Sequence, residues 1–220
     1  TALTVIRAIA AACGVTVGDV TGVTDVSVTG LREGYTCREM LGLMAALLGR
    51  NAHIDRYGRL CLRWYAASGK TVTPDDYYPG ELTMADSDYA VDRIESTEDD
   101  VTTEETETTV YAAGSGTTGI SIADEYMTQA ILNGIYTELG GLTWRPMTVT
   151  FYGDARIETG DILTVTDADR QSHAVPVMKV VHSWDGGVKT TVTAFGNPSR
   201  GLSVSPGGAL SKSVSNLMAE

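Results

Sequence analysis

Three acidic side chains lie close together in the sequence, between two segments with strand-like patterns. They are Asp154, Glu158 and Asp161. A glycoside hydrolase needs two carboxylates about 5–10 Å apart across a groove, which acids at strand ends could supply. Asp residues next to Gly are also common in turns, because the carboxylate accepts local N–H groups. We therefore interpret the three acids as turn residues, and a cell-wall-degrading glycosidase or peptidase module remains the alternative.

Other chemically capable residues are scattered. His53, His173 and His182 have no nearby Ser or Cys in a G-x-S-x-G elbow, and no H-E-x-x-H spacing occurs. The Ser-Gly-Lys-Thr run around Lys70 lacks the upstream glycine of a phosphate loop, and Pro74 opposes the helix that should follow. The sequence predicts no enzyme and assigns no catalytic, cofactor-binding or metal-ligating residue.

Aromatic and thiol side chains give weaker indications. Trp144 and Trp184 could form a platform for a sugar ring, so a carbohydrate-binding module is a further alternative, although Trp next to an apolar run is more typical of a core or interface. The three cysteines show no C-x-x-C or Cys/His spacing. They are expected to be buried thiols of a protein made in a reducing cytoplasm, instead of a disulfide or metal site.

The formal net charge of −12 disfavours specific nucleic-acid binding, which needs clustered Lys and Arg. Seven acids and no base occur in the segment 95–107. This segment lacks the alternating acids and central Gly of a calcium loop, so it predicts a solvated hairpin or loop. No apolar run is long enough for a membrane span, and membrane insertion is not expected.

The hydrophobic pattern predicts an α+β protein. Residues 1–67 are expected to form a small α/β helix-hairpin domain, with helices at 2–13 and 37–48. Thr36 and Glu39 have the spacing of a capping box at the start of the second helix. Asp55-Arg56-Tyr57-Gly58 is typical of the bend of a hairpin.

The remainder reads as a linker and a second domain. Composition predicts a linker at 68–80, a mainly antiparallel β-barrel domain at 81–198 with a packed helix at 125–139, and a flexible exit with a truncated helix at 199–220. The last four strands of the barrel are expected at Met147–Tyr152, Asp161–Thr166, Ala174–Ser183 and Val188–Phe195. Pro176 belongs at a sheet edge or a bulge. Because the pattern begins at Thr1 without an initiator Met, the chain is expected to be a fragment of something larger.

Three segments, in order and spacing, resemble phage and prophage tail-tip proteins. Residues 36–64 resemble the family's helix-then-hairpin segment, and 111–136 resemble its Gly-broken hairpin and helix, with Asp124-Glu125 in place of Asn-Pro. Residues 147–184 resemble its closing barrel. The matching positions are Leu48-Gly49, Ile54-Asp55, Gly58-Arg59-Leu60, Asp154, Gly160-Asp161 and Val165.

The family resembles the baseplate hub of contractile phages and the tail-associated (Tal-like) protein of long-tailed phages. The resemblance implies a homotrimeric ring at the virion tail tip, joining the tail tube or distal tail protein to a downstream spike or fibre. It also implies that an amino-terminal barrel precedes this segment. The acidity could keep a DNA conduit from retaining DNA, or it could simply aid solubility.

Overall fold

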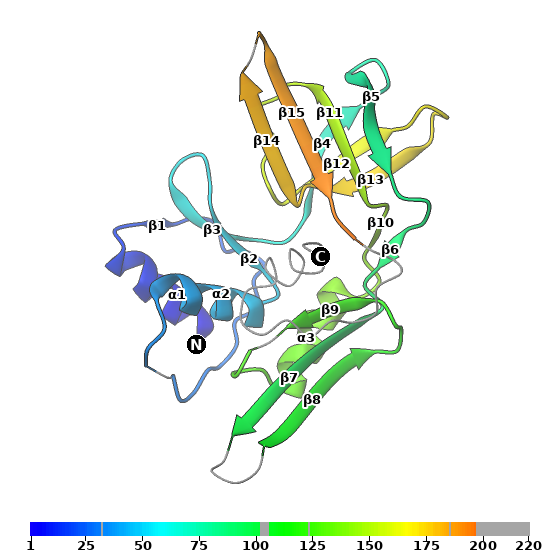
Figure 1. Ribbon diagram of the computed structural model, residues 1–220. Helices are drawn as coiled ribbons and strands as arrows, with labels where there is room; N and C mark the ends of the chain where they lie inside the picture. Colours follow the sequence, from blue (N-terminus) through cyan, green and yellow to red (C-terminus); the bar gives the residue numbers. More distant parts are fainter. Residues whose placement is uncertain (32, 102–105, 123, 185, 197–220) are drawn as a thin grey trace. The chain divides into compact units, whose positions relative to one another are not determined.

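The computed structural model describes residues 1–31, 33–101, 106–122, 124–184 and 186–196. It is a mixed α+β structure in which the chain divides into two compact units (Figure 1). The first unit holds residues 1–64 and 91–142, and the second holds 65–90 and the described part of 143–199. The second unit's strands β4–β6 are thus separated in sequence from its strands β10–β15 by a segment of the first unit.

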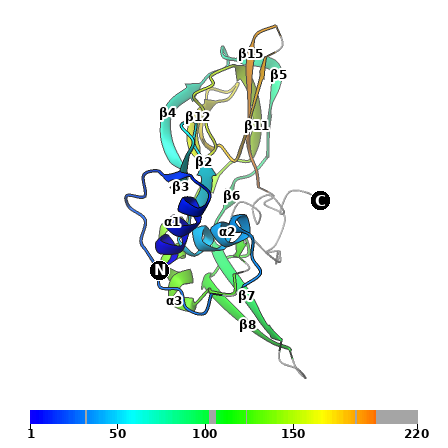
Figure 2. The same ribbon diagram turned by 90° about the vertical axis from the view of Figure 1, so that its left-hand side faces the viewer.

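The first unit begins with two helices, α1 (Ala2–Ala12) and α2 (Cys37–Leu47), which pack against each other (Figure 2). The Thr36 side chain accepts a hydrogen bond from the Glu39 N–H, and the Glu39 carboxylate accepts one from the Thr36 N–H, which confirms the capping box. Gly14 ends α1 with a φ of +68°, a conformation that Gly adopts without strain.

The strands of the first unit form two three-stranded sheets. One has the order β1-β3-β2, from Thr16–Val17, Arg59–Arg63 and Asn51–Ile54. The other has the order β8-β7-β9, from Thr106–Gly114, Arg93–Val101 and Gly119–Ile122. Helix α3 (Gln129–Leu139) packs on β7 and β8 and buries Leu132, Ile135 and Leu139. The helix expected within the barrel domain therefore belongs to the first unit, and its N-cap is Thr128.

The described residues of the acidic segment 95–107 lie in β7 and β8, which pair antiparallel as the predicted hairpin requires. Residues 102–105 are outside the described residues, as are the predicted exit and truncated helix at 199–220. Residues 15–29 are all described, and β1 is the one strand among them.

The second unit contains two larger sheets and a short pair. The larger sheet has the order β14-β15-β11-β5, and the smaller has the order β13-β12-β4. Their strands are β4 (Ala66–Val72), β5 (Tyr77–Met84), β11 (Met147–Tyr152), β12 (Asp161–Thr166), β13 (Ser172–Pro176), β14 (Lys179–Trp184) and β15 (Val188–Ala194). The pair is β6 (Tyr89–Ala90) with β10 (Thr143–Trp144).

Alternation of buried and exposed residues along β11 and β12 gives each of the larger sheets one apolar face. The core residues of this unit include Val149, Leu163, Val165, Val175 and Val192, all with no exposed side-chain surface. The strand orders of the described residues do not close into a ring, so the predicted barrel is not confirmed.

The predicted linker at 68–80 is instead part of β4 and β5. Strand β4 pairs parallel with β12, and the register shifts between Ile162 and Thr164, opposite the Ser68-Gly69-Lys70 segment. Gly69 lies in this irregular segment with a φ of +69°, a conformation that glycine adopts readily. The predicted strand Ala174–Ser183 is two strands, because the chain passes from β13 in one sheet to β14 in the other just after Pro176. Pro176 lies on an edge strand, as predicted.

Candidate functional site

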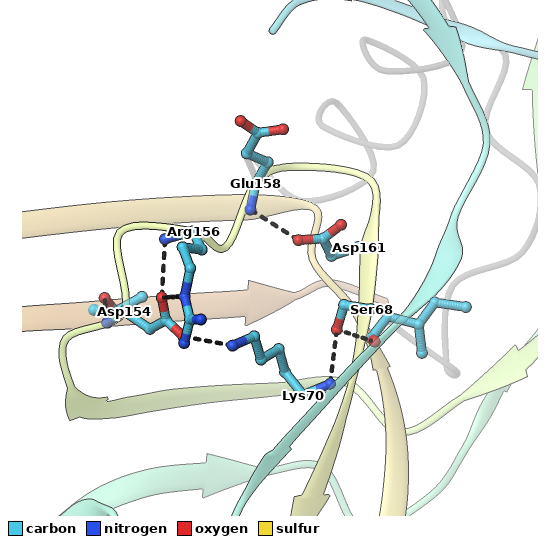
Figure 3. Close-up of polar contacts among 8 residues, drawn as sticks. Ser68, Lys70, Asp154, Arg156, Glu158 and Asp161 are labelled. Carbon is cyan, nitrogen blue, oxygen red and sulfur yellow. Dashed lines mark hydrogen bonds and ion pairs between the residues drawn. The ribbon is translucent and has the colours of Figure 1, made fainter. Parts of the chain in front are cut away.

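The three acids that the sequence singled out lie between the end of β11 and the first residue of β12 (Figure 3). Asp154 lies just after β11, Glu158 lies in the middle of the segment, and Asp161 opens β12. The Glu158 carboxylate points away from the other two (Figure 3). The three carboxylates therefore do not converge on one space.

Asp154 is held by two cations. Its carboxylate accepts hydrogen bonds from Nε and Nη2 of Arg156, each at 2.8 Å, and from the Arg156 backbone N–H at 3.0 Å. Nζ of Lys70 on β4 lies 3.1 Å from Oδ2 of the same carboxylate. The hydrogen bond from the Arg156 side chain, outweighing partial burial, holds the pKa of Asp154 well below its usual range. A general acid must hold a proton that it can donate, and a carboxylate kept ionised by two cations does not. Asp154 is therefore better suited to anchoring the loop.

Arg156→Gln is expected to reduce the dependence of stability on acidic pH. Because the pKa of Asp154 is lower in the folded protein than its ordinary 3.8, the stabilisation is fully present above that value and is lost as the pH falls through the folded-state pKa. Arg156 is mostly exposed, so the variant should lose little stability at pH 7, and it should lose still less at pH 2. Urea unfolding at both pH values measures it. Arg170→Gln, in the β12–β13 turn, is the control, and an equal pH effect in both variants would contradict the assignment.

Asp161 stabilises the turn that leads into β12. Its Oδ2 accepts a hydrogen bond from the Glu158 N–H at 2.9 Å, while its own N–H donates to the Glu158 carbonyl at 3.2 Å. Its carbonyl accepts from the Val177 N–H at 2.8 Å, and Asp161 is only 9% exposed. The interpretation of Asp154 and Asp161 as turn residues agrees with these contacts.

The Ser-Gly-Lys-Thr run lies within strand β4. The Ser68 hydroxyl donates to the Ile162 carbonyl at 2.8 Å and accepts from the Lys70 N–H at 3.2 Å (Figure 3). No helix follows this run, since β4 continues to Val72. The backbone therefore pairs with a neighbouring strand and does not form a phosphate cradle.

The histidines lie in separate places. His53 is in β2 of the first unit, and Nε2 of His173 lies 2.9 Å from Oδ2 of Asp167 beside the β12–β13 turn. His182 contacts the Thr190 hydroxyl through Nδ1 at 3.0 Å and the Ile157 carbonyl through Nε2 at 3.3 Å. A hydroxyl bound to an imidazole is a pairing that nucleophilic catalysis uses. Thr190 has no exposed surface, however, so its hydroxyl cannot reach a substrate in this structure.

The Thr190 hydroxyl instead connects the loop to the sheet. It accepts a hydrogen bond from the Asp154 N–H at 3.0 Å. With Nε2 of His182 protonated, every donor in the series has an acceptor: Asp154 N–H to Thr190, Thr190 O–H to His182, and His182 N–H to Ile157. The series fixes both ends of the 154–157 segment.

The two tryptophans proposed for a sugar platform have different environments. Trp144 is 5% exposed, its ring lies 4.9 Å from that of Tyr89, and its Nε1 donates to the Phe195 carbonyl. Trp184 is 68% exposed at the end of β14. A sugar platform built from two tryptophans needs a face of each ring open to the ligand. Because Trp144 is a core residue, these observations do not favour the carbohydrate-binding module.

The cysteines differ from one another in exposure. Cys61 on β3 is buried, whereas Cys13 at the end of α1 and Cys37 at the start of α2 are exposed. The buried residues of α1 end at Ala10, and those of α2 begin at Leu43. Both exposed cysteines therefore lie beyond the packed parts of their helices, and the expectation of three buried thiols is wrong for Cys13 and Cys37.

Within the described ranges, no three His, Cys, Asp or Glu side chains are grouped so that they could hold a metal ion. None of the helices in those ranges is long and apolar enough to cross a membrane. Sequence reasoning missed the partners of Asp154, namely Lys70 and Thr190, because both lie on strands far away in the sequence. The Asp154–Arg156 spacing is the one local signal that could have indicated an ion pair.

Comparison with known proteins gives structural matches alone. No protein-family profile matches the sequence, and no curated protein matches it. The chain is similar to the 43 kDa tail protein of prophage MuSo2 from Shewanella oneidensis, with a TM-score of 0.57, 13% identity and 89% of this chain covered. It is also similar to the tail protein from Neisseria meningitidis MC58, with a TM-score of 0.52, 15% identity and 88% covered. The chain shares its fold with phage tail proteins.

The tail-protein fold extends over both units, since the two matches cover nearly the whole chain. The chain spans 64% and 66% of the length of these two tail proteins, just under two thirds. At 13% and 15% identity, the likeness establishes the fold.

Proposed function

We propose that this chain is a structural component of a phage or prophage tail, acting in the tail tip or baseplate hub. The observation that carries the proposal is the similarity in fold to two tail proteins over 88–89% of the chain. The contacts of Asp154, Asp161 and Thr190 support a structural role over an enzymatic one, because each polar group already serves the fold. The protein would be made in the bacterial cytoplasm and incorporated into the virion tail tip.

In this proposal the chain forms a homotrimeric ring between the tail tube or distal tail protein and a spike or fibre. It binds no specific nucleic acid and does not insert into a membrane. One surface suited to contact with another copy is the outer face of the sheet β14-β15-β11-β5. Its outward-facing residues on three strands are Lys179, Val181, Ser183, Lys189, Thr191, Thr193, Thr148, Thr150 and Tyr152.

This outer face differs in charge from the chain as a whole. Strands β11, β14 and β15 contain two Lys and no Asp or Glu, and β5 contains one acid, Glu81, whereas the chain has a net charge of −12. Tyr152 is 61% exposed, its ring centre lies 4.9 Å from that of Tyr78 in a tilted arrangement, and Nζ of Lys189 lies 4.8 Å from the Tyr78 ring centre. An aromatic, weakly basic face complements an acidic surface of a second copy.

The purified chain is expected to form a particle of three times its own mass in light scattering, seen as a three-fold ring by electron microscopy. Thr150→Glu places a charge in the middle of the outer face and should weaken assembly by roughly tenfold or more, because the carboxylate would be buried without a partner. Thr164→Glu, on an exposed position of β12 in the other sheet, is the matched control and should assemble normally. A strictly monomeric wild type, or release of peptidoglycan fragments that Asp154→Ala abolishes, would contradict the proposal.

A further inference from the structure

The hairpin formed by β2 and β3 exposes large side chains at its bend. Tyr57 is 76% exposed, which exceeds the 68% of Trp184, and Ile54 at the end of β2 is 56% exposed. Both residues lie within four positions of each other, on either side of Asp55 and Arg56. A large aromatic side chain and an aliphatic one exposed together are typical of a surface that meets another protein.

A single carboxylate holds this bend in place. Oδ1 of Asp55 accepts hydrogen bonds from the N–H groups of Tyr57 and Arg59, each at 2.9 Å. Its Oδ2 accepts from Nε of Arg59, also at 2.9 Å, and the Arg59 guanidinium lies 5.1 Å from the centre of the Tyr57 ring. Because the bend is already fixed in the single chain, little conformational entropy would be lost when Tyr57 meets a partner.

The hairpin is also basic, in an acidic chain. Residues 51–63 contain three Arg and one Asp, whereas the whole chain has a net charge of −12. Tyr and Arg are enriched among the residues that dominate the binding energy of protein interfaces. A fixed, exposed Tyr among Arg residues therefore suits contact with an acidic protein surface.

The chain has an acidic surface of this kind along β5, which we name the acidic edge. Residues 75–88 contain no Lys or Arg and five acids, namely Asp75, Asp76, Glu81, Asp86 and Asp88. All of these except Asp76 are exposed, although Asp88 is paired with Arg145. Strand β5 is at the edge of its sheet, and the half-buried Leu82 and Met84 follow the exposed Glu81 along it. The acidic edge thus offers carboxylates for Arg and apolar side chains for Tyr57 and Ile54.

We propose that the β2–β3 hairpin of one copy docks on the acidic edge of a second copy. The inference rests on the proposed function, because it names a contact between neighbouring copies of the ring. In a three-fold ring each contact joins two different surfaces, one from each neighbour, and this chain contains both. The acidic edge belongs to the same sheet as the outer face β14-β15-β11-β5, so the two form one continuous interface. This continuity favours it over the acidic segment 95–107.

Tyr57→Ala tests the aromatic part of the contact. The variant should weaken assembly of the full chain by roughly tenfold in light scattering, because the ring would be buried between copies. Its melting temperature under conditions where the chain is monomeric should be unchanged, since the ring is mostly exposed in the single chain. Tyr35→Ala removes another exposed ring of the same unit and should assemble as the wild type does.

Exchange of charges tests the choice of partner. Arg56→Glu and Glu81→Arg should each weaken assembly by roughly tenfold, and the two changes in one chain should restore most of it. Arg7→Glu, on an exposed position of α1, is the control for reversal of a charge and should assemble normally.

The outcomes separate this contact from the proposed function. A three-fold ring that forms equally well with Tyr57→Ala or Arg56→Glu would overturn the docking of the hairpin and leave the tail role standing. Rescue of Arg56→Glu by Asp99→Arg on β7, and not by Glu81→Arg, would overturn the choice of the acidic edge. A strictly monomeric wild type would contradict the ring and this contact together.

Discussion

Gly119→Ala is expected to lower the free energy of unfolding by about 3 kcal/mol. Gly119 opens β9 and lies opposite Arg93 in a parallel pair with β7. A Cβ at this position would lie 1.7 Å from the Arg93 carbonyl oxygen and 2.7 Å from its carbonyl carbon. Both are backbone atoms, so no side-chain rotation relieves the clash and the strands must separate.

The separation would also disturb the approach of the chain to β9. The N–H groups of Asp92 and Arg93 both donate to the Thr118 carbonyl at 3.1 Å, and the Thr118 hydroxyl donates to the Asp92 carboxylate at 2.8 Å. Urea unfolding of the full chain, followed by circular dichroism, gives the change in stability.

Gly134→Ala is the matched control. Gly134 lies inside α3 in the same unit, and a Cβ there would meet nothing within 4 Å. Since Ala is favoured over Gly in a helix interior, the variant should gain about 0.5–1 kcal/mol. Equal destabilisation by the two substitutions would show that the close approach of β9 to β7 at Gly119 is not the cause of the lost stability.

Elements whose signals lie within a few residues were predictable from the sequence. The capping box of Thr36 and Glu39 and the hairpin bend ending in Gly58 depend on neighbours in the chain. Strands β11 and β12 begin and end where their alternation begins and ends. The local pattern was sufficient here because one face of each strand is buried and the other is not.

Elements that depend on distant partners were not predictable. Gly69 and Pro79 indicated a linker, but each lies in a strand whose pairing is shifted by a bulge against a partner far along the chain. The assignment of α3 to the wrong domain has a similar cause, because β7–β9 interrupt the second unit in sequence. Amino-acid composition predicts neither β-bulges nor units built from segments that are separate in the sequence.

The candidate site divides in the same way. The turn roles of Asp154 and Asp161 followed from Gly-Asp pairs, which act on their immediate neighbours. The ion pair with Lys70 and the hydrogen bond to Thr190 come from other strands, and no spacing rule connects them to Asp154. Only the structure could therefore show that the carboxylates of Asp154, Glu158 and Asp161 do not converge.

Thr190→Val is expected to lower the free energy of unfolding by about 2 kcal/mol. The substitution keeps the shape of a completely buried side chain but removes its hydroxyl. The Asp154 N–H and Nδ1 of His182 would then each lose a hydrogen-bond partner that water cannot easily replace. The loop that carries Asp154 and Arg156 should also loosen, which hydrogen exchange at the Asp154 amide can measure.

Thr191→Val tests whether the effect comes from the hydrogen bonds or from the strand. Thr191 is the next residue of β15 and is half-buried on the opposite face, where its hydroxyl lies 3.0 Å from that of Thr150. Val suits a strand, so this variant should change stability by less than about 0.5 kcal/mol and leave exchange at Asp154 unaltered. If the two variants lost equal stability, the loop would be held by its own turn contacts and the Asp154–Arg156 ion pair, and the buried hydroxyl would contribute no more than an ordinary strand residue.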